Sequence, residues 1–136
     1  MFTHHNPATA SAPVSAYSQG VAAKKGARWL YISGQVGLTP EGDLEGDAIA
    51  QMETCWQRIF AVLQDAGMNK KDLVKITAYV TDSELIGTYR EVRDRNLNGV
   101  LTASTLLVVS ALAHPDWVVE IEAVAAAYPA PLQRNP

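Results

Sequence analysis

The sequence predicts an α+β domain in which a mixed β-sheet carries two helices on one face. Its segments alternate between the two-residue period of strands and the 3.6-residue period of helices, in the order ββ-α-β-α-ββ. The two helices are similar in size and each follows a strand region, so both are expected to cross over the same face of the sheet. A chain of 136 residues has the length of one such domain.

The first part of the chain is predicted to be an arm followed by a β-hairpin. Residues 1–13 are assigned to the arm, because the beginning of the chain is rich in Ser, Thr, Ala and Pro. Strands are expected over residues 17–23 and 28–36, and residues 24–26 (Lys-Lys-Gly) are typical of a hairpin turn. Residues 37–46 contain Pro and three Gly, which predicts a loop.

An amphipathic helix is predicted from the N-cap candidate Asp47 to Gly67, a residue typical of helix ends. Its apolar residues recur at spacings of three and four and form one stripe: Ile49, Met52, Trp56, Ile59, Leu63 and Ala66. A second helix is expected from residues 81–83 (Thr-Asp-Ser), which offer an N-cap, to about Leu97. This helix is mostly polar and has a single narrow apolar stripe.

Three further strands are expected after the first helix. Residues 73–80 alternate apolar and polar side chains, as a half-buried strand does. Residues 104–109 are apolar and β-branched, which indicates a buried strand. Residues 117–125 alternate again and complete the sheet. Residues 129–136 hold three prolines and are predicted to form a loose C-terminal tail.

The sheet face opposite the helices is also expected to hold apolar side chains, among them Val118 and Val124. A single layer of helices leaves this face uncovered. Because contiguous apolar surface is rarely left in water, we expect the face to pack against another copy of the chain.

Composition disfavours several classes of function. A net charge of −3 and an aromatic content of 7% argue against binding to nucleic acid or anionic lipid. The sequence has neither a span of membrane length nor a basic and apolar leader, so a cytoplasmic protein is expected. Metal-ligand spacing is absent among the three histidines, His4, His5 and His114, and the single Cys55. The position of Cys55 is more typical of a core residue than of a reactive thiol. We therefore expect neither a metal nor a cofactor.

Glu120 and Glu122 are the first candidates for acid–base chemistry. On one face of a strand, residues two apart lie roughly 7 Å from each other. A carboxylate on an otherwise apolar face is either at an exposed rim or in a semi-buried site, where it can position or deprotonate water. The pattern alone leaves both interpretations open. Ser33-Gly34-Gln35, at the end of a strand, could bring backbone N–H groups close to an anionic ligand.

Three segments in this order resemble the signature segments of the Rid (RidA/YjgF) family of reactive-intermediate deaminases. They are Tyr17-Ser18-Gln19-Gly20-Val21, Ile32-Ser33-Gly34-Gln35 and Val119-Glu120-Ile121-Glu122-Ala123-Val124-Ala125. The resemblance extends over about residues 14–127, so a Rid-like domain is expected over residues 14–128. It implies a chorismate-mutase-like fold and a homotrimer with inward-facing sheets and clefts between adjacent subunits.

The resemblance also implies an activity and a set of site residues. Archetypal Rid proteins hydrolyse 2-aminoacrylate and similar enamines and imines to 2-keto acids and ammonia, without a metal or a cofactor. Carried over by position, Glu120 would position the attacking water. Tyr17 would line the cleft, and Ser33 and Gly34 would contact the small-molecule ligand.

One departure from the family pattern bears on the substrate. Archetypal members carry an arginine that binds the substrate carboxylate, and its position falls on Ser104 in this chain. Serine cannot replace a bidentate guanidinium, so Ser104 and Thr105 are expected to offer hydrogen bonds to a neutral or differently charged ligand. The leading hypothesis is a cofactor-independent hydrolase of a small imine or enamine. The alternative is a non-catalytic trimer that binds a small metabolite as a sensor or as a partner of another enzyme.

Overall fold

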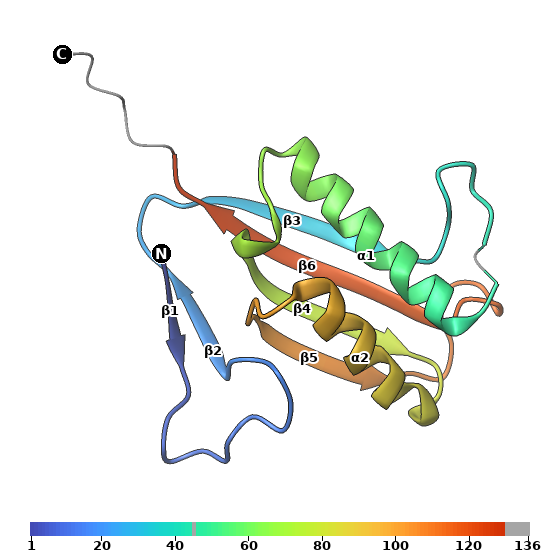
Figure 1. Ribbon diagram of the computed structural model, residues 1–136, viewed down its shortest axis with the longest axis horizontal. Helices are drawn as coiled ribbons and strands as arrows, with labels where there is room; N and C mark the ends of the chain where they lie inside the picture. The colour runs from blue at the N-terminus through green and yellow to red at the C-terminus, as the bar shows by residue number, and fades with distance from the viewer. Residues whose placement is uncertain (45, 130–136) are drawn as a thin grey trace.

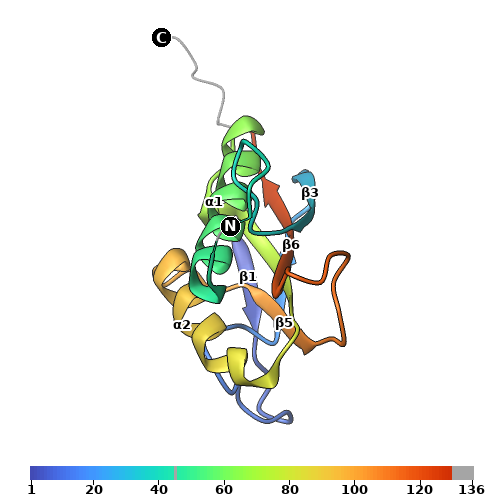
Figure 2. The same ribbon diagram turned by 90° about the vertical axis from the view of Figure 1, so that its right-hand side faces the viewer.

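A four-stranded mixed sheet forms the centre of the computed structural model, which describes residues 1–44 and 46–129. The strands are β1 (Phe2–His5), β2 (Gly20–Ala23), β3 (Arg28–Gln35), β4 (Leu73–Val80), β5 (Ala103–Val108) and β6 (Val119–Ala127). The helices are α1 (Ala48–Asp65) and α2 (Ile86–Leu97), with the short 3₁₀ turns η1 (Lys70–Asp72) and η2 (Ser83–Leu85). Both α1 and α2 lie on one face of the sheet, which confirms the predicted architecture (Figures 1 and 2).

The sheet has the strand order β3-β6-β4-β5. The last strand in sequence, β6, lies in the interior of the sheet and pairs antiparallel with both β3 and β4. Strand β5 pairs parallel with β4, and α2 is the crossover between them, as expected for a parallel pair. The four-stranded sheet therefore has one face against the helices and one face without helices, which we call the open face (Figure 2).

The predicted hairpin between residues 17–23 and 28–36 is wrong, because the strands found there, β2 and β3, do not pair. Strand β2 pairs antiparallel with β1, from Phe2 opposite Ala23 to His5 opposite Gly20, in a separate two-stranded sheet. The reason lies just before β2, where Ser18 donates its backbone N–H to Thr102 O (2.9 Å) and bridges to Ala103 at the start of β5. This anchor is at the sheet edge opposite β3, so the chain must cross to the other edge between β2 and β3 (Figure 1).

Helix α1 starts where the sequence predicts, because Asp47 Oδ1 accepts a hydrogen bond from Ala50 N at 2.8 Å. Four members of the predicted stripe are fully buried against the sheet: Met52, Trp56, Ile59 and Leu63. Ile49 is an exception and remains 50% exposed in the first turn of the helix. The described part of the chain contains no helix long and apolar enough to cross a membrane.

Strand β6 begins two residues later than predicted, and the buried side chain of Gln51 in α1 accounts for this. Gln51 Oε1 accepts a hydrogen bond from Val118 N at 3.0 Å, and its Nε2 donates to Asp116 O at 3.1 Å. These bonds hold the preceding turn against the first turn of α1, where Val118 packs against the core. The expectation that Val118 faces away from the helices is therefore wrong, whereas Val124 does lie on the open face, opposite Lys75.

The structure describes the N-terminal segment of the chain but almost none of the C-terminal segment. The predicted N-terminal arm, residues 1–13, contains strand β1. The predicted loose tail, residues 129–136, lies outside the described residues except for Pro129. The second helix begins with η2, where Asp82 Oδ1 accepts from Glu84 N at 2.9 Å, and α2 ends at Asn98 in the left-handed conformation (φ 47°).

Two glycine substitutions test the packing of α1 on the sheet. A Cβ at Gly37 would lie 2.7 Å from Cα of Gln51, a backbone atom that cannot move aside alone. Gly37→Ala is therefore expected to lower the free energy of unfolding by about 1–3 kcal/mol. The matched control is Gly87→Ala in α2, where a Cβ meets no atom within 4 Å and the value should rise by about 0.5–1 kcal/mol. Urea denaturation measures both, and an equally stable Gly37→Ala variant would contradict the close contact.

Candidate functional site

The open face of the sheet carries a cluster of polar side chains across β6, β4 and β5. Glu120 lies opposite Tyr79, and Glu122 lies opposite Thr77. Thr105 of β5 is the next residue in the same row, opposite Thr77 in the parallel pair. Since residues opposite each other in a sheet share a face, the alternation that buries Val119, Ile121 and Ala123 places both glutamates away from the helices.

The carboxylate of Glu120 lies directly against the backbone of Gly34. A Cβ built on Gly34 would be 2.6 Å from Glu120 Oε2, so only glycine leaves room for this carboxylate. The pairing of β3 with β6 is irregular between Ile32 and Gln35, which is where Ser33 and Gly34 pass the glutamate. No residue in the described ranges donates a hydrogen bond to the Glu120 side chain, which leaves its oxygens available to a water or a ligand.

Glu122, in contrast, has a protein partner. The hydroxyl of Tyr79 donates a hydrogen bond to Glu122 Oε1. This hydrogen bond, together with partial desolvation and the negative charge of Glu122, raises the pKa of Tyr79 above its usual value. The neutral phenol is therefore the stable form of Tyr79, and Glu122 is held by it beside the free carboxylate of Glu120.

Lys75 supplies a positive charge on the same face. Its Nζ donates a hydrogen bond to Thr105 Oγ1 at 2.5 Å. Burial lowers the pKa of Lys75, and the nearby Glu122 partly opposes this shift. The sequence interpretation missed both Lys75 and Tyr79. The signal for them was the polar side of the alternating segment 73–80, which falls on the same face as the glutamates.

Two of the predicted site residues lie elsewhere. Ser104 pairs with Ile76, a fully buried residue, so its side chain faces α2 and not the open face. With Tyr17 it lines a cavity of about 190 Å³ beside α2. The structure thus brings together Glu120, Ser33, Gly34 and Thr105 on the open face, and places Tyr17 and Ser104 on the helix side of β5. Consecutive residues of a strand face opposite ways, so Ser104 and Thr105 cannot both face Glu120.

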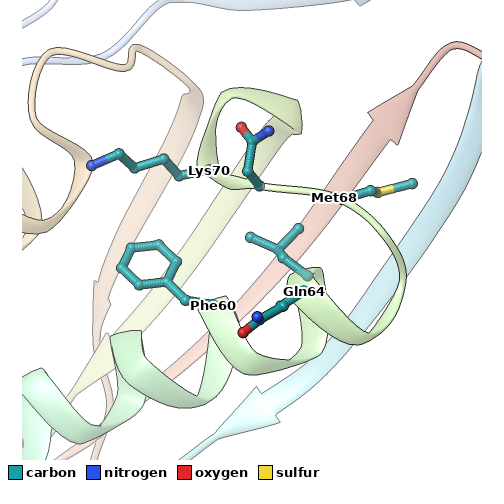
Figure 3. A pocket seen from close by; sticks show the side chains of 6 residues that line it. Phe60, Gln64, Met68 and Lys70 are labelled. Atoms are coloured by element: carbon teal, nitrogen blue, oxygen red, sulfur yellow. The ribbon is translucent and has the colours of Figure 1, made fainter. Parts of the chain in front are cut away.

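A second cavity, of about 340 Å³, lies between the end of α1 and η1 (Figure 3). Phe60, Leu63 and Met68 give it an apolar lining, and Lys70, at its rim, donates to Asn96 O at 3.2 Å. The cavity contains none of the predicted site residues and no carboxylate. Its composition does not fit acid–base chemistry.

The remaining sequence candidates do not form a reactive centre. Cys55 is fully buried in α1, and desolvation raises the pKa of its thiol to about 12, so the nucleophilic thiolate is not formed near neutral pH. His4 Nδ1 is hydrogen-bonded to Ser18 Oγ at 2.7 Å, and the ring of His114 lies 5.5 Å from that of Trp117. Within residues 1–44 and 46–129, no three His, Cys, Asp or Glu side chains gather as a metal site would require.

The sequence comparisons with known proteins agree with one another on the family of this chain. The family model described as endoribonuclease L-PSP matches residues 7–127. The chain is 33% identical over 118 residues to a 2-iminobutanoate/2-iminopropanoate deaminase of Mus musculus, covering 85% of this chain and 84% of that protein. It is 32% identical to a RutC family protein of Aquifex aeolicus, covering 85% and 92% of the two chains.

Solved structures agree with these relatives. The crystal structure of the Rid-family protein YyfB from Yersinia pestis superposes with a TM-score of 0.84 at 29% identity, over 93% of this chain and 98% of that one. RidA from an Antarctic Psychrobacter superposes with a TM-score of 0.70 at 34% identity, over 87% and 94% of the respective chains. The likeness therefore extends over nearly the whole described domain.

Proposed function

The chain belongs to the Rid family, and from this premise we propose that it hydrolyses a small reactive imine or enamine without a metal or cofactor. The mouse relative named above is a 2-iminobutanoate/2-iminopropanoate deaminase, which supports the reaction class. The observation that carries the proposal is the Glu120 carboxylate, held against Gly34 and without a hydrogen-bond donor among the described residues.

The chemistry requires one base and one water. Glu120 accepts a proton from water as the water oxygen attacks the imine carbon, which gives a tetrahedral carbinolamine. Glu120 returns the proton to the nitrogen, which completes the neutral carbinolamine. The proton of its hydroxyl group then passes through Glu120 to the nitrogen, the C–N bond breaks, and ammonia leaves as the carbonyl forms. A carboxylate is suited to this role if it faces the ligand and has no competing partner. Glu122, which accepts from Tyr79, is the less available of the two carboxylates.

We also propose that the site lies in a cleft between subunits of a homotrimer. The open face that holds Glu120 also holds exposed apolar side chains, with Tyr31 76% and Leu107 47% exposed. Val124, half-buried in the single chain, lies between Tyr31 and Lys75 on this face. A second copy that covered these residues would bury apolar surface and enclose the polar cluster at its border. The cytoplasmic location expected from the sequence stays a prediction.

The alternative function, a trimer that binds a small metabolite without converting it, has one observation in its favour. On the open face β5 offers Ala103 and Thr105, and neither has a guanidinium. The only cation that we find on this face in the described chain is Lys75, which is already bonded to Thr105. An RNA-cleaving function, suggested by the description of the family model, is disfavoured by the two glutamates on this face and the net charge of −3.

Substitution of Glu120 tests the proposed reaction. Glu120→Gln is expected to lower the rate of imine hydrolysis at least about 100-fold, because the amide cannot accept the proton. Gly34→Ala is expected to cause a similar loss with little change in stability, because the three atoms nearest its Cβ all belong to the Glu120 side chain (Oε2, Cδ and Cγ) and none to the backbone. Glu91→Gln, on the exposed side of α2, is the charge-matched control. The measurement is the release of ammonia from imines generated by an amino-acid oxidase.

Undiminished hydrolysis in Glu120→Gln would contradict the role of this residue. If the wild-type protein accelerates hydrolysis of none of the imines yet binds them, the alternative function is favoured.

The substrate range is the next prediction. Without a guanidinium beside Glu120, 2-iminopropionate is expected to be hydrolysed roughly 30- to 1000-fold more slowly than by an arginine-bearing relative, because about 2–4 kcal/mol of binding is missing. Thr105→Arg, on the same face of the sheet as Glu120, should raise the rate. Ser104→Arg, on the opposite face, is the matched control and should not. Trapping of the imine by semicarbazide follows the reaction, and a wild-type rate equal to that of the relative would show that the arginine is not needed.

The oligomer is tested separately. A trimer is expected by analytical ultracentrifugation at micromolar concentration. Val124→Asp should dissociate it, because unpaired carboxylates would be buried in the interface. A stable wild-type monomer would remove both the trimer and the shared cleft.

A further inference from the structure

A cavity on the helix side of β5 contains two arginines that the proposed reaction does not use. It lies between α2, β5 and residues 14–17, and has a volume of about 190 Å³. Arg90 and Arg93 project into it from α2, and Tyr17 and Ser104 add hydroxyl groups. In a chain of net charge −3, two guanidinium groups at one small cavity are a local excess of positive charge.

Arg93 is the main feature of this cavity because it is almost completely buried, with 2% of its surface exposed. Its Nε donates to Asp94 Oδ1 at 2.9 Å, and one terminal nitrogen lies 3.4 Å from Ser15 Oγ, which is at most a weak hydrogen bond. A guanidinium has five N–H donors. No other described residue accepts from Arg93, so its second terminal nitrogen has no protein partner. That nitrogen is not among the described buried polar atoms without a partner, which means that it is accessible although the side chain as a whole is buried.

An accessible guanidinium nitrogen without a protein acceptor can donate a charge-assisted hydrogen bond to an anion in the cavity. The carboxylate of Asp94 neutralises one of the two guanidinium charges. The other positive charge is left to attract one further negative group. Arg90 has no acidic partner within residues 1–44 and 46–129. Two planar guanidiniums and two hydroxyls suit the flat, two-oxygen geometry of a carboxylate. Val14 and Leu106 line the rest of the cavity and suit a short carbon chain.

We propose that this cavity is a binding site for a small organic carboxylate, which Arg93 and Arg90 bind by charge-assisted hydrogen bonds. A volume of about 190 Å³ accommodates about six non-hydrogen atoms, the size of a short oxo or hydroxy acid. The site is separate from the one at Glu120, because Ser104 faces it while Thr105 faces the opposite side of the sheet. A bound carboxylate would join α2 to residues 14–17, the segment that leads to the Ser18 anchor.

The test is a titration of the full-length protein with pyruvate, followed by amide chemical shifts in NMR and by calorimetry. Saturable shifts are expected at residues around Arg90, Arg93 and Ser104. Arg93→Gln and Arg90→Gln should each weaken binding about tenfold or more. Arg95→Gln is the matched control, since its side chain is 62% exposed on the same helix and pairs with Glu53. Arg90→Gln keeps the test decisive if the buried Arg93 proves necessary for folding.

Two further measurements distinguish binding in this cavity from binding beside Glu120 and from a general affinity for anions. Binding should persist in Glu120→Gln, whatever that variant does to imine hydrolysis, so failure of the proposed reaction and failure of this inference are distinguishable. Pyruvamide, which lacks the charge, should not bind. The proposal is overturned if pyruvate does not saturate, if the shifts centre on Gly34 and Glu120, or if Arg95→Gln weakens binding as much as Arg90→Gln. Binding of inorganic phosphate but not of pyruvate would overturn the assignment to carboxylates.

Discussion

Burial of a single face of the sheet under α1 and α2 decides where the chemically active side chains lie. In β6 the residues Val119, Ile121 and Ala123 are buried beneath these helices, so Glu120 and Glu122 must face the other way. A shift of one residue in the pairing would exchange the apolar residues for two carboxylates in the core. Because each buried aliphatic side chain contributes roughly 1.5–3 kcal/mol, that alternative is strongly disfavoured. The same constraint that stabilises the fold therefore places both glutamates together.

The parts of this fold that the sequence predicts well are those with a strong local period. The stripe of α1 with its Asp47 cap, and the alternation in β4 and β6, were enough to identify the helices, the sheet and the Glu120 face. The pairing of β2 was not predictable, because it depends on the anchor of Ser18 at Thr102, 84 residues away. Which side chains of β5 face the helices could not be predicted either, for another reason. Its apolar residues do not alternate with polar ones, so only the register with β4 shows that Ser104 faces the helices.

The two sides of the sheet differ in their charge. Among the described residues, the open face combines the carboxylates of Glu120 and Glu122 with the ammonium of Lys75, whereas the helix side of β5 has the guanidiniums of Arg90 and Arg93 beside the carboxylate of Asp94. Glu122 and Lys75 each have a neutral hydrogen-bond partner, in Tyr79 and Thr105 respectively. These bonds hold the neighbours of Glu120 in place without occupying it. On this face, Glu122, Tyr79, Lys75 and Thr105 are thus held by hydrogen bonds to one another, whereas the carboxylate of Glu120 is left accessible.

The Ser18 anchor has a consequence for the solution behaviour of the protein. Strand β5 is an edge strand, and an uncovered edge presents unpaired N–H and C=O groups to which another polypeptide can add. The segment before β2 occupies the beginning of that edge with its own backbone, through the Ser18–Thr102 hydrogen bond and the bridge to Ala103. The N-terminal residues therefore block strand addition at the beginning of this edge. Their loss through proteolysis would expose the backbone groups at the start of β5 and favour edge-to-edge association, even with the core intact.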